Sequence, residues 1–187
     1  MRRFALALAA LALGACGQNE NVAAPEACAR SATHAMAWTQ SEARDVITTT
    51  AHGPSCRQAA VTFVVRNAAG DPLWVFASSY DLMTIGAAAP ADAPPVTPEQ
   101  MDAFLTAWAD VTMSQTSALP EWRADAATLT ESATTFAYDT PFARETYEAL
   151  RAADLRMICF AAGVETSRCL IVDPASGEPA QIVTYGP

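Results

Sequence analysis

The chain has 187 residues, with 11 basic and 20 acidic side chains and a formal net charge of −9. This acidic balance argues against nucleic acid as a partner, because the phosphate backbone attracts basic surfaces. All the basic residues are arginines, which excludes the lysine chemistry of P-loops, Schiff bases and Ser-Lys pairs.

Residues 1–15 have the pattern of a secretory signal peptide. Arg2 and Arg3 form a short positive region, and an unbroken apolar run from Phe4 to Leu13 follows. That run is too short to span a bilayer, but its length and its charged start are typical of a signal peptide. We therefore leave these residues out of the predicted fold.

The end of this leader, Leu13-Gly14-Ala15-Cys16, resembles the lipobox of bacterial lipoproteins. The resemblance implies cleavage before Cys16, a diacylglycerol group on its thiol and an acyl chain such as palmitate on its new amine. Several chains make anchoring stable, whereas one gives only marginal binding. In many such proteins an aspartate directly after the lipidated cysteine causes retention at the inner membrane. This chain has Gly17 at that position, so the resemblance implies a lipid anchor in the outer membrane, at its periplasmic face.

The remaining chain has the size of one domain. Removing 15 residues from 187 leaves 172, within the usual range for a single domain. We expect residues 16–27 to be the lipidated N-terminus and linker, and residues 28–187 to form one globular domain. Without Arg2 and Arg3, 9 basic residues stand against 20 acidic ones, a net charge of −11.

The first half of the predicted domain is mostly strands. A helix is expected over residues 25–38 because Pro25 suits a first helical turn. β-branched residues predict a strand over 45–51, and turn residues between two apolar arms predict a hairpin of 60–66 and 73–79. Residues 87–98 are rich in alanine and proline and are expected to be an exposed connection.

A second predicted helix begins after Thr97. Thr97 is its expected N-cap, Pro98 its first residue, and Gln100 completes a capping box. Its apolar residues recur at helical spacing and predict one packed face. They are Met101, Phe104, Leu105, Trp108 and Val111.

The last third is expected to add strands and another helix. Strands are predicted over 126–130 and 134–138, a helix opens at Thr140-Pro141 and runs to Asp154, and strands follow over 155–161, 168–172 and 180–185. The order predicts an α+β single domain with a mainly antiparallel sheet and two principal helices. It is compatible with a profilin-like or roadblock-like topology.

Four cysteines remain once Cys16 is assigned to lipid. Cys28, Cys56, Cys159 and Cys169 predict two disulfides in an oxidising compartment. Three connectivities are possible. Cys159 with Cys169 is favoured because the two are directly opposite in the predicted terminal hairpin, where cross-strand neighbours approach closely enough to bond. Cys28 would then pair with Cys56.

A competing interpretation uses both histidines of the chain. Cys28, His34, His52 and Cys56 could hold zinc or copper, or His34 and His52 could serve a periplasmic hydrolase. Either role requires the two histidines to converge. The spacing does not match a compact Cys2His2 finger, and no haem-attachment, C-x-x-C, G-x-S-x-G or H-E-x-x-H motif is present. The sequence therefore predicts no catalytic residue, metal or cofactor.

Anchor, linker and disulfides together favour a non-enzymatic envelope lipoprotein. Its expected partners are the lipid bilayer, through acylated Cys16, and a protein of the envelope that it binds, inhibits or helps to assemble. One form is an inhibitor of a cationic host hydrolase such as lysozyme, which the net charge of −11 would attract. The alternative is a periplasmic metal-binding protein or hydrolase built on His34 and His52.

Overall fold

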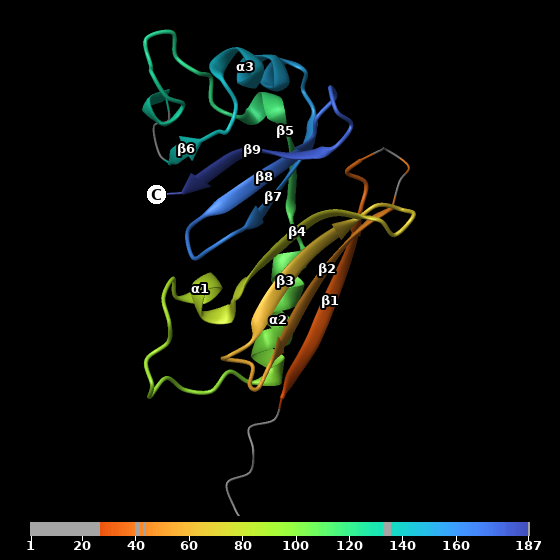
Figure 1. Cartoon of the computed structure of the whole chain (residues 1–187), viewed down its shortest axis with the longest axis vertical. Helices are drawn as coiled ribbons and strands as arrows, with labels where there is room; N and C mark the ends of the chain where they lie inside the picture. The colour runs from red at the N-terminus through yellow and green to blue at the C-terminus, as the bar shows by residue number, and fades with distance from the viewer. Residues whose placement is uncertain (1–26, 40–41, 43, 133–135, 187) are drawn as a thin grey trace, which may run out of the picture.

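The computed structural model describes residues 27–39, 42, 44–132 and 136–186. Its first half contains a four-stranded antiparallel sheet, here the N-terminal sheet, with β1 (Cys28–Met36), β2 (Asp45–Gly53), β3 (Ala60–Arg66) and β4 (Pro72–Ser79) in chain order (Figure 1). Every second residue of β2 is buried from its start to Ala51. This alternation is expected for a sheet covered on one face. The predicted strand and hairpin are confirmed.

The helix predicted over 25–38 is wrong, because Cys28–Met36 forms β1 and residues 25–26 lie outside the described residues. Its strand pairs with β2 over nine residues, from Cys28 opposite Gly53 to Met36 opposite Asp45. Helix propensity is a weak preference that tertiary pairing overrides. The nine-residue ladder and the burial of Met36 therefore decide the conformation.

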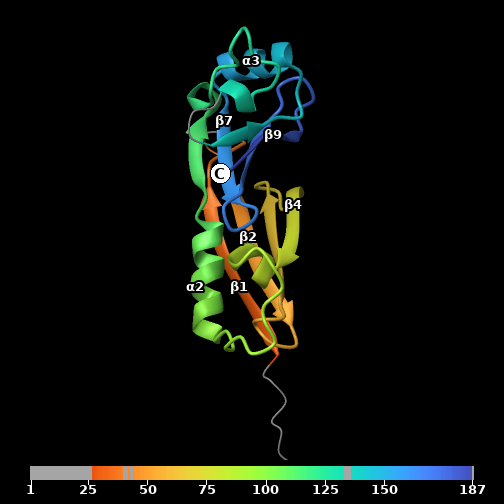
Figure 2. The same ribbon diagram turned by 90° about the vertical axis from the view of Figure 1, so that its left-hand side faces the viewer.

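The helix predicted after Thr97 is confirmed as α2 (Pro98–Ala109). Thr97 and Gln100 form the expected capping box, and Met101, Leu105 and Trp108 are buried. The helix covers β1 and β2 (Figure 2). The buried hydroxyl of Thr49 donates a hydrogen bond to the carbonyl of Leu105 at 2.9 Å, which fastens the helix to β2.

The second half forms a five-stranded antiparallel sheet, here the C-terminal sheet, with strand order β5-β7-β8-β9-β6. The three predicted terminal strands are confirmed, whereas β5 was not predicted, and β6 is shorter than the predicted strand 134–138, of which 134–135 lie outside the described residues. The bounds are β5 (Thr112–Gln115), β6 (Ala137–Asp139), β7 (Arg156–Ala161), β8 (Ser167–Val172) and β9 (Pro179–Gly186).

The helices around the C-terminal sheet depart from the sequence prediction. No strand forms over residues 126–130: residues 127–129 are bends, and a short 3-10 helix, Thr130–Ser132, begins at the end of this stretch. Helix α3 (Arg144–Ala152) begins four residues later than predicted. The hydroxyl of Thr140 donates instead to the carbonyl of Ile182 at 2.7 Å, so it holds the chain against β9. Another short helix, α1 (Tyr80–Thr84), follows β4 directly.

Two apolar cores meet along the molecule. The first lies between the N-terminal sheet, α2 and the inner face of β7 and β8, and the second lies between the C-terminal sheet and α3. Phe63 of β3 stacks on Phe160 of β7 with ring centroids 4.5 Å apart. This contact joins the sheets into one domain. The predicted α+β class is confirmed, with two antiparallel sheets, while the profilin-like or roadblock-like topology stays a prediction.

The molecule is elongated, and its two ends differ. Strand β1 begins at one end, beside the β2–β3 connection, whereas α3 lies at the other end (Figures 1 and 2). The chain that precedes Cys28 therefore joins the domain at the end opposite α3.

Candidate functional site

The four cysteines of the described domain form two disulfides, Cys28–Cys56 and Cys159–Cys169. The second joins directly opposite residues of β7 and β8, the register expected from the sequence. The first ties the start of β1 to the β2–β3 connection. Both bonds hold neighbouring segments of the fold together, which is a structural role.

Cys16 and Gly17 lie outside the described residues, as do the leader 1–15 and the linker up to residue 26. Lipid attachment at Cys16 therefore stays a prediction. Among the helices of the part of the chain that the structure describes, none is long and apolar enough to cross a membrane.

The structure does not bring the two histidines together. His34 lies on β1 opposite Ile47, whereas His52 lies on β2 opposite Ala29. Ala29 and His34 are five residues apart on one strand, so the histidines are separated by roughly 17 Å along the sheet and point to opposite faces. Asp110 Oδ1 lies 3.9 Å from His34 Nδ1.

A zinc or copper site would need Cys28 and Cys56 as ligands beside the histidines. These two cysteines are instead bonded to each other as a disulfide. Within the described ranges, no group of three or more histidine, cysteine, aspartate or glutamate side chains is placed to hold a metal ion. The arrangement that the metal or hydrolase alternative requires, two converging histidines, is not formed.

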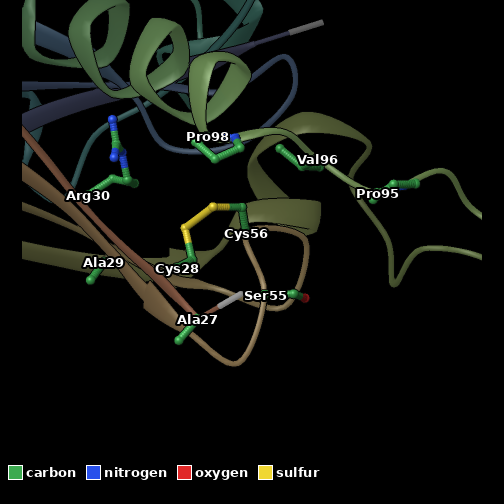
Figure 3. Close-up of a pocket in the computed structure, with 9 residues that line it drawn as sticks. All are labelled: Ala27, Cys28, Ala29, Arg30, Ser55, Cys56, Pro95, Val96 and Pro98. Atoms are coloured by element: carbon green, nitrogen blue, oxygen red, sulfur yellow. A yellow bond between two sulfur atoms is a disulfide. The ribbon is translucent and has the colours of Figure 1, made fainter. Parts of the chain in front are cut away.

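A pocket of about 350 Å³ lies beside the Cys28–Cys56 disulfide (Figure 3). It is bounded by the start of β1, the β2–β3 connection and the chain that enters α2. Its walls are small or apolar apart from Ser55 and Arg30. The lining residues are Ala27, Cys28, Ala29, Arg30, Ser55, Cys56, Pro95, Val96 and Pro98.

The charge in this pocket is already paired. Arg30 extends toward α2 (Figure 3), where its Nε donates to Asp102 Oδ1 at 2.7 Å and its Nη2 donates to Oδ2. These hydrogen bonds hold the pKa of Asp102 below its usual value, because they stabilise the carboxylate. The ion pair fastens β1 to α2 at the rim of the pocket.

A second pocket of about 470 Å³ shares Ser55 and Pro95 with the first. Its floor contains an ion pair between Arg57 Nη1 and Asp81 Oδ1 at 3.0 Å, and both side chains are largely buried. Arg57 Nε also donates to the carbonyl of Pro94, and Asp81 Oδ2 accepts from the backbone N–H of Ala89. The alanine- and proline-rich connection is mostly exposed, as predicted, but this pair pins its backbone to the domain.

Sequence reasoning assigned no role to Arg57, Asp81 or Arg168. The first two are 24 residues apart, and the guanidinium of Arg168 lies over the ring of Phe76, which is 92 residues away. No local motif marks such contacts. The only signal was the rarity of basic residues in an acidic chain, which makes the surroundings of each arginine informative.

Comparisons with known proteins add no relative: no family model, no curated protein and no solved structure matches this chain.

Proposed function

We propose that this chain is an exported lipoprotein, anchored through acylated Cys16 at the periplasmic face of the outer membrane, and that its domain is a non-enzymatic binding, inhibitory or assembly module. The observation that carries the proposal is the pair of closed disulfides. Structural disulfides persist in oxidising compartments and are rare in the cytosol. They agree with the leader and lipobox pattern that precede the domain.

The position of the domain's first strand supports anchoring from the N-terminal side. Because β1 begins at the end opposite α3, a tether that joins at Cys28 leaves the rest of the surface clear (Figure 1). Residues 16–27 span at most about 40 Å when extended. The α3 end would point away from the bilayer, and the two pockets near the disulfide would face it.

Binding is favoured over catalysis by what the polar groups of these pockets contact. Arg30 is paired with Asp102, and Arg57 with Asp81, so these charges are engaged in holding the fold. The remaining walls are mostly apolar or small. Pockets of this kind recognise shape and apolar surface.

The proposal is tested by labelling the chain in a Gram-negative host with an alkyne analogue of palmitate, followed by intact mass measurement. We expect a mature chain that begins at an acylated Cys16 and contains two disulfides. Cys16→Ser should lose the label and keep its leader. A double variant with Cys28→Ser and Cys56→Ser is the matched control and should keep the label.

The predicted location at the outer membrane is tested by a separate substitution. Gly17→Asp should shift the labelled protein from the outer-membrane to the inner-membrane fraction of a density gradient, without changing its acylation. A mature chain that starts elsewhere, or a label that persists in the Cys16→Ser variant, would rule the anchor out.

A further inference from the structure

The N-terminal sheet has an outer face, on the side opposite α2 (Figure 2). Because side chains alternate along a strand, the residues between the buried ones share this face. The outer face consists of every second residue of β1 over 29–35, of β2 over 46–52 and of β3 over 60–66, together with Val75, Ala77 and Ser79 of β4. None of these side chains is buried.

The outer face lacks the acidic character of the rest of the chain. The chain has 20 acidic residues and a net charge of −9, but no position of the outer face holds an aspartate or a glutamate. His52 and Arg66 are its titratable residues, and they lie at opposite ends of it. Interface centres are depleted in charge. The outer face is therefore a surface at which two copies of this acidic chain can approach with little repulsion.

The middle of the outer face is an array of hydroxyl groups on small side chains. Ser31, Thr50 and Thr62 form one row across β1, β2 and β3, and Thr33 and Thr48 begin the next row. The Oγ1 atoms of Thr50 and Thr62 are hydrogen-bonded at 2.7 Å. A hydroxyl both donates and accepts, so it is satisfied by a neighbouring or facing hydroxyl. Such a face can pack against an identical one without leaving polar groups unpaired.

We propose that the outer face packs against the outer face of a second copy of this chain, so that two sheets lie face to face in a symmetric dimer. Strands lie about 4.8 Å apart and rise about 3.3 Å per residue, so the face measures about 19 by 23 Å. Two such faces bury roughly 900 Å² before the relief of the side chains is counted, close to the ~1,000 Å² that a specific interface needs. An interface of this size predicts a dissociation constant in the micromolar range.

The direction of the strands is compatible with two anchored copies. The strands of the N-terminal sheet run roughly along the long axis of the molecule, and β1 begins at one end of it (Figure 1). Sheets packed face to face keep their strands within about 30° of each other. A two-fold axis along the strands therefore places Cys28 of both copies at the same end. This orientation rests on the proposed anchor, because both tethers then reach one bilayer, where the copies meet at a raised effective concentration.

Sedimentation equilibrium of the purified mature chain tests the dimer. An acylated chain is measured in a detergent matched to the density of the solvent, and a chain without lipid is measured in buffer, so that failure of the anchor does not decide the result. We expect twice the chain mass at about 100 µM and the mass of one chain at about 1 µM. Unfolding measured at the lower concentration then reports on the single chain. The mass of one chain at both concentrations would overturn the proposal.

Two substitutions place a charge on the outer face. Thr33→Arg and Thr48→Arg should each weaken self-association by at least about tenfold, because an unpaired charge would be buried between the sheets. The matched control is Thr112→Arg, which adds the same charge at an exposed position of β5. It should dimerise like the unaltered chain. Equal self-association in all three variants would contradict the outer face as the interface.

Hydroxyl-radical footprinting of the unaltered chain decides if the arginine variants do not fold. His52 and Val75 should react less at about 100 µM than at about 1 µM, whereas Met113 on β5, which is 46% exposed, should react equally at both concentrations. Unchanged reactivity of His52 and Val75 would overturn the proposal. If they are unreactive at both concentrations in a monomer, the chain before Cys28 covers the face. If they are reactive at both, the face is left for a different partner.

Discussion

The two halves of the molecule differ in how far along the chain their strands find partners. In the N-terminal sheet, each strand pairs with the next one in sequence. In the C-terminal sheet, β5 pairs with β7 and β6 pairs with β9, so that Thr112 lies opposite Cys159. The first half is therefore assembled from strands that follow one another in sequence, whereas the second adds two edge strands from earlier in the chain to the consecutive strands β7, β8 and β9.

The second half also contains a long segment without strands, between β5 and β6, that is held in place by side chains. The segment between β5 and β6 receives hydrogen bonds from α3 side chains in place of a strand ladder. Arg151 Nε donates to the carbonyl of Leu119 at 2.8 Å, the Tyr147 hydroxyl donates to the carbonyl of Pro120 at 2.7 Å, and Arg144 Nη1 donates to that of Ala124 at 3.0 Å. Side chains of one short helix thus fix a long connection.

The largest expected effect comes from the contact that joins the halves. Phe63→Ala removes the ring that stacks on Phe160 and leaves a cavity between the sheets, which should cost about 3–5 kcal/mol in the free energy of unfolding. Urea unfolding followed by far-ultraviolet circular dichroism and by tryptophan fluorescence measures it. Because both cores meet here, the two probes should report one transition in the unaltered chain.

The control for that substitution is Val75→Ala on β4, whose side chain is 60% exposed. It should change the free energy of unfolding by less than about 0.5 kcal/mol. Separate transitions for the two probes would show that the halves unfold independently, as two domains do.

The next effect compares the two disulfides. Replacing both cysteines of the Cys28–Cys56 bond by serine opens a loop with a sequence separation of 28, against 10 for Cys159–Cys169. In the chain-entropy model the losses are about 3.6 and about 2.7 kcal/mol, respectively. Denaturant unfolding of the two double variants tests this order. The reverse order would mean that contacts in the folded state, and not loop length, set the contribution of each bond.

The same contrast explains how much of the fold could be predicted. The hairpin of β3 and β4 has turn residues between two apolar arms, and α2 has a complete capping box, so both have local signals. β1 was misread because small residues occupy both of its faces: Ala29 and Ser31 are exposed, while Ala32 packs in the core. Without a contrast between the faces, a strand has no period-two pattern.

Features that depend on distant partners could not be predicted. β5 is a strand because it pairs with β7, about 45 residues later, and α3 begins late because the Thr140 hydroxyl bonds to Ile182. The cysteines of the candidate site were identified by counting and by register. Arg168 was not, because its relation to Phe76 exists only after the two sheets pack together.

The smallest expected effect concerns the link between α3 and the irregular segment. Tyr147→Phe removes the hydrogen bond to the Pro120 carbonyl and should cost about 1 kcal/mol at pH 7. Tyr80→Phe is the control, because the Tyr80 hydroxyl has no hydrogen bond within the described residues while its ring contacts Phe104. It should leave stability nearly unchanged, and an equal loss in both variants would contradict a specific role for the Tyr147 bond.

Measuring the stability of Tyr147→Phe at alkaline pH tests the burial of this side chain further. Burial raises the pKa of Tyr147 above its ordinary value of about 10, because the phenolate is poorly solvated inside the domain. A group whose pKa is raised on folding adds stability that is fully present below the unfolded-state pKa and is lost as pH rises above it. The unaltered chain should therefore lose more stability than Tyr147→Phe between about pH 9 and pH 11, so that the difference measured at pH 7 shrinks. If the difference stays constant across that range, the phenol is not held neutral by burial, and α3 fixes the segment without enclosing this side chain.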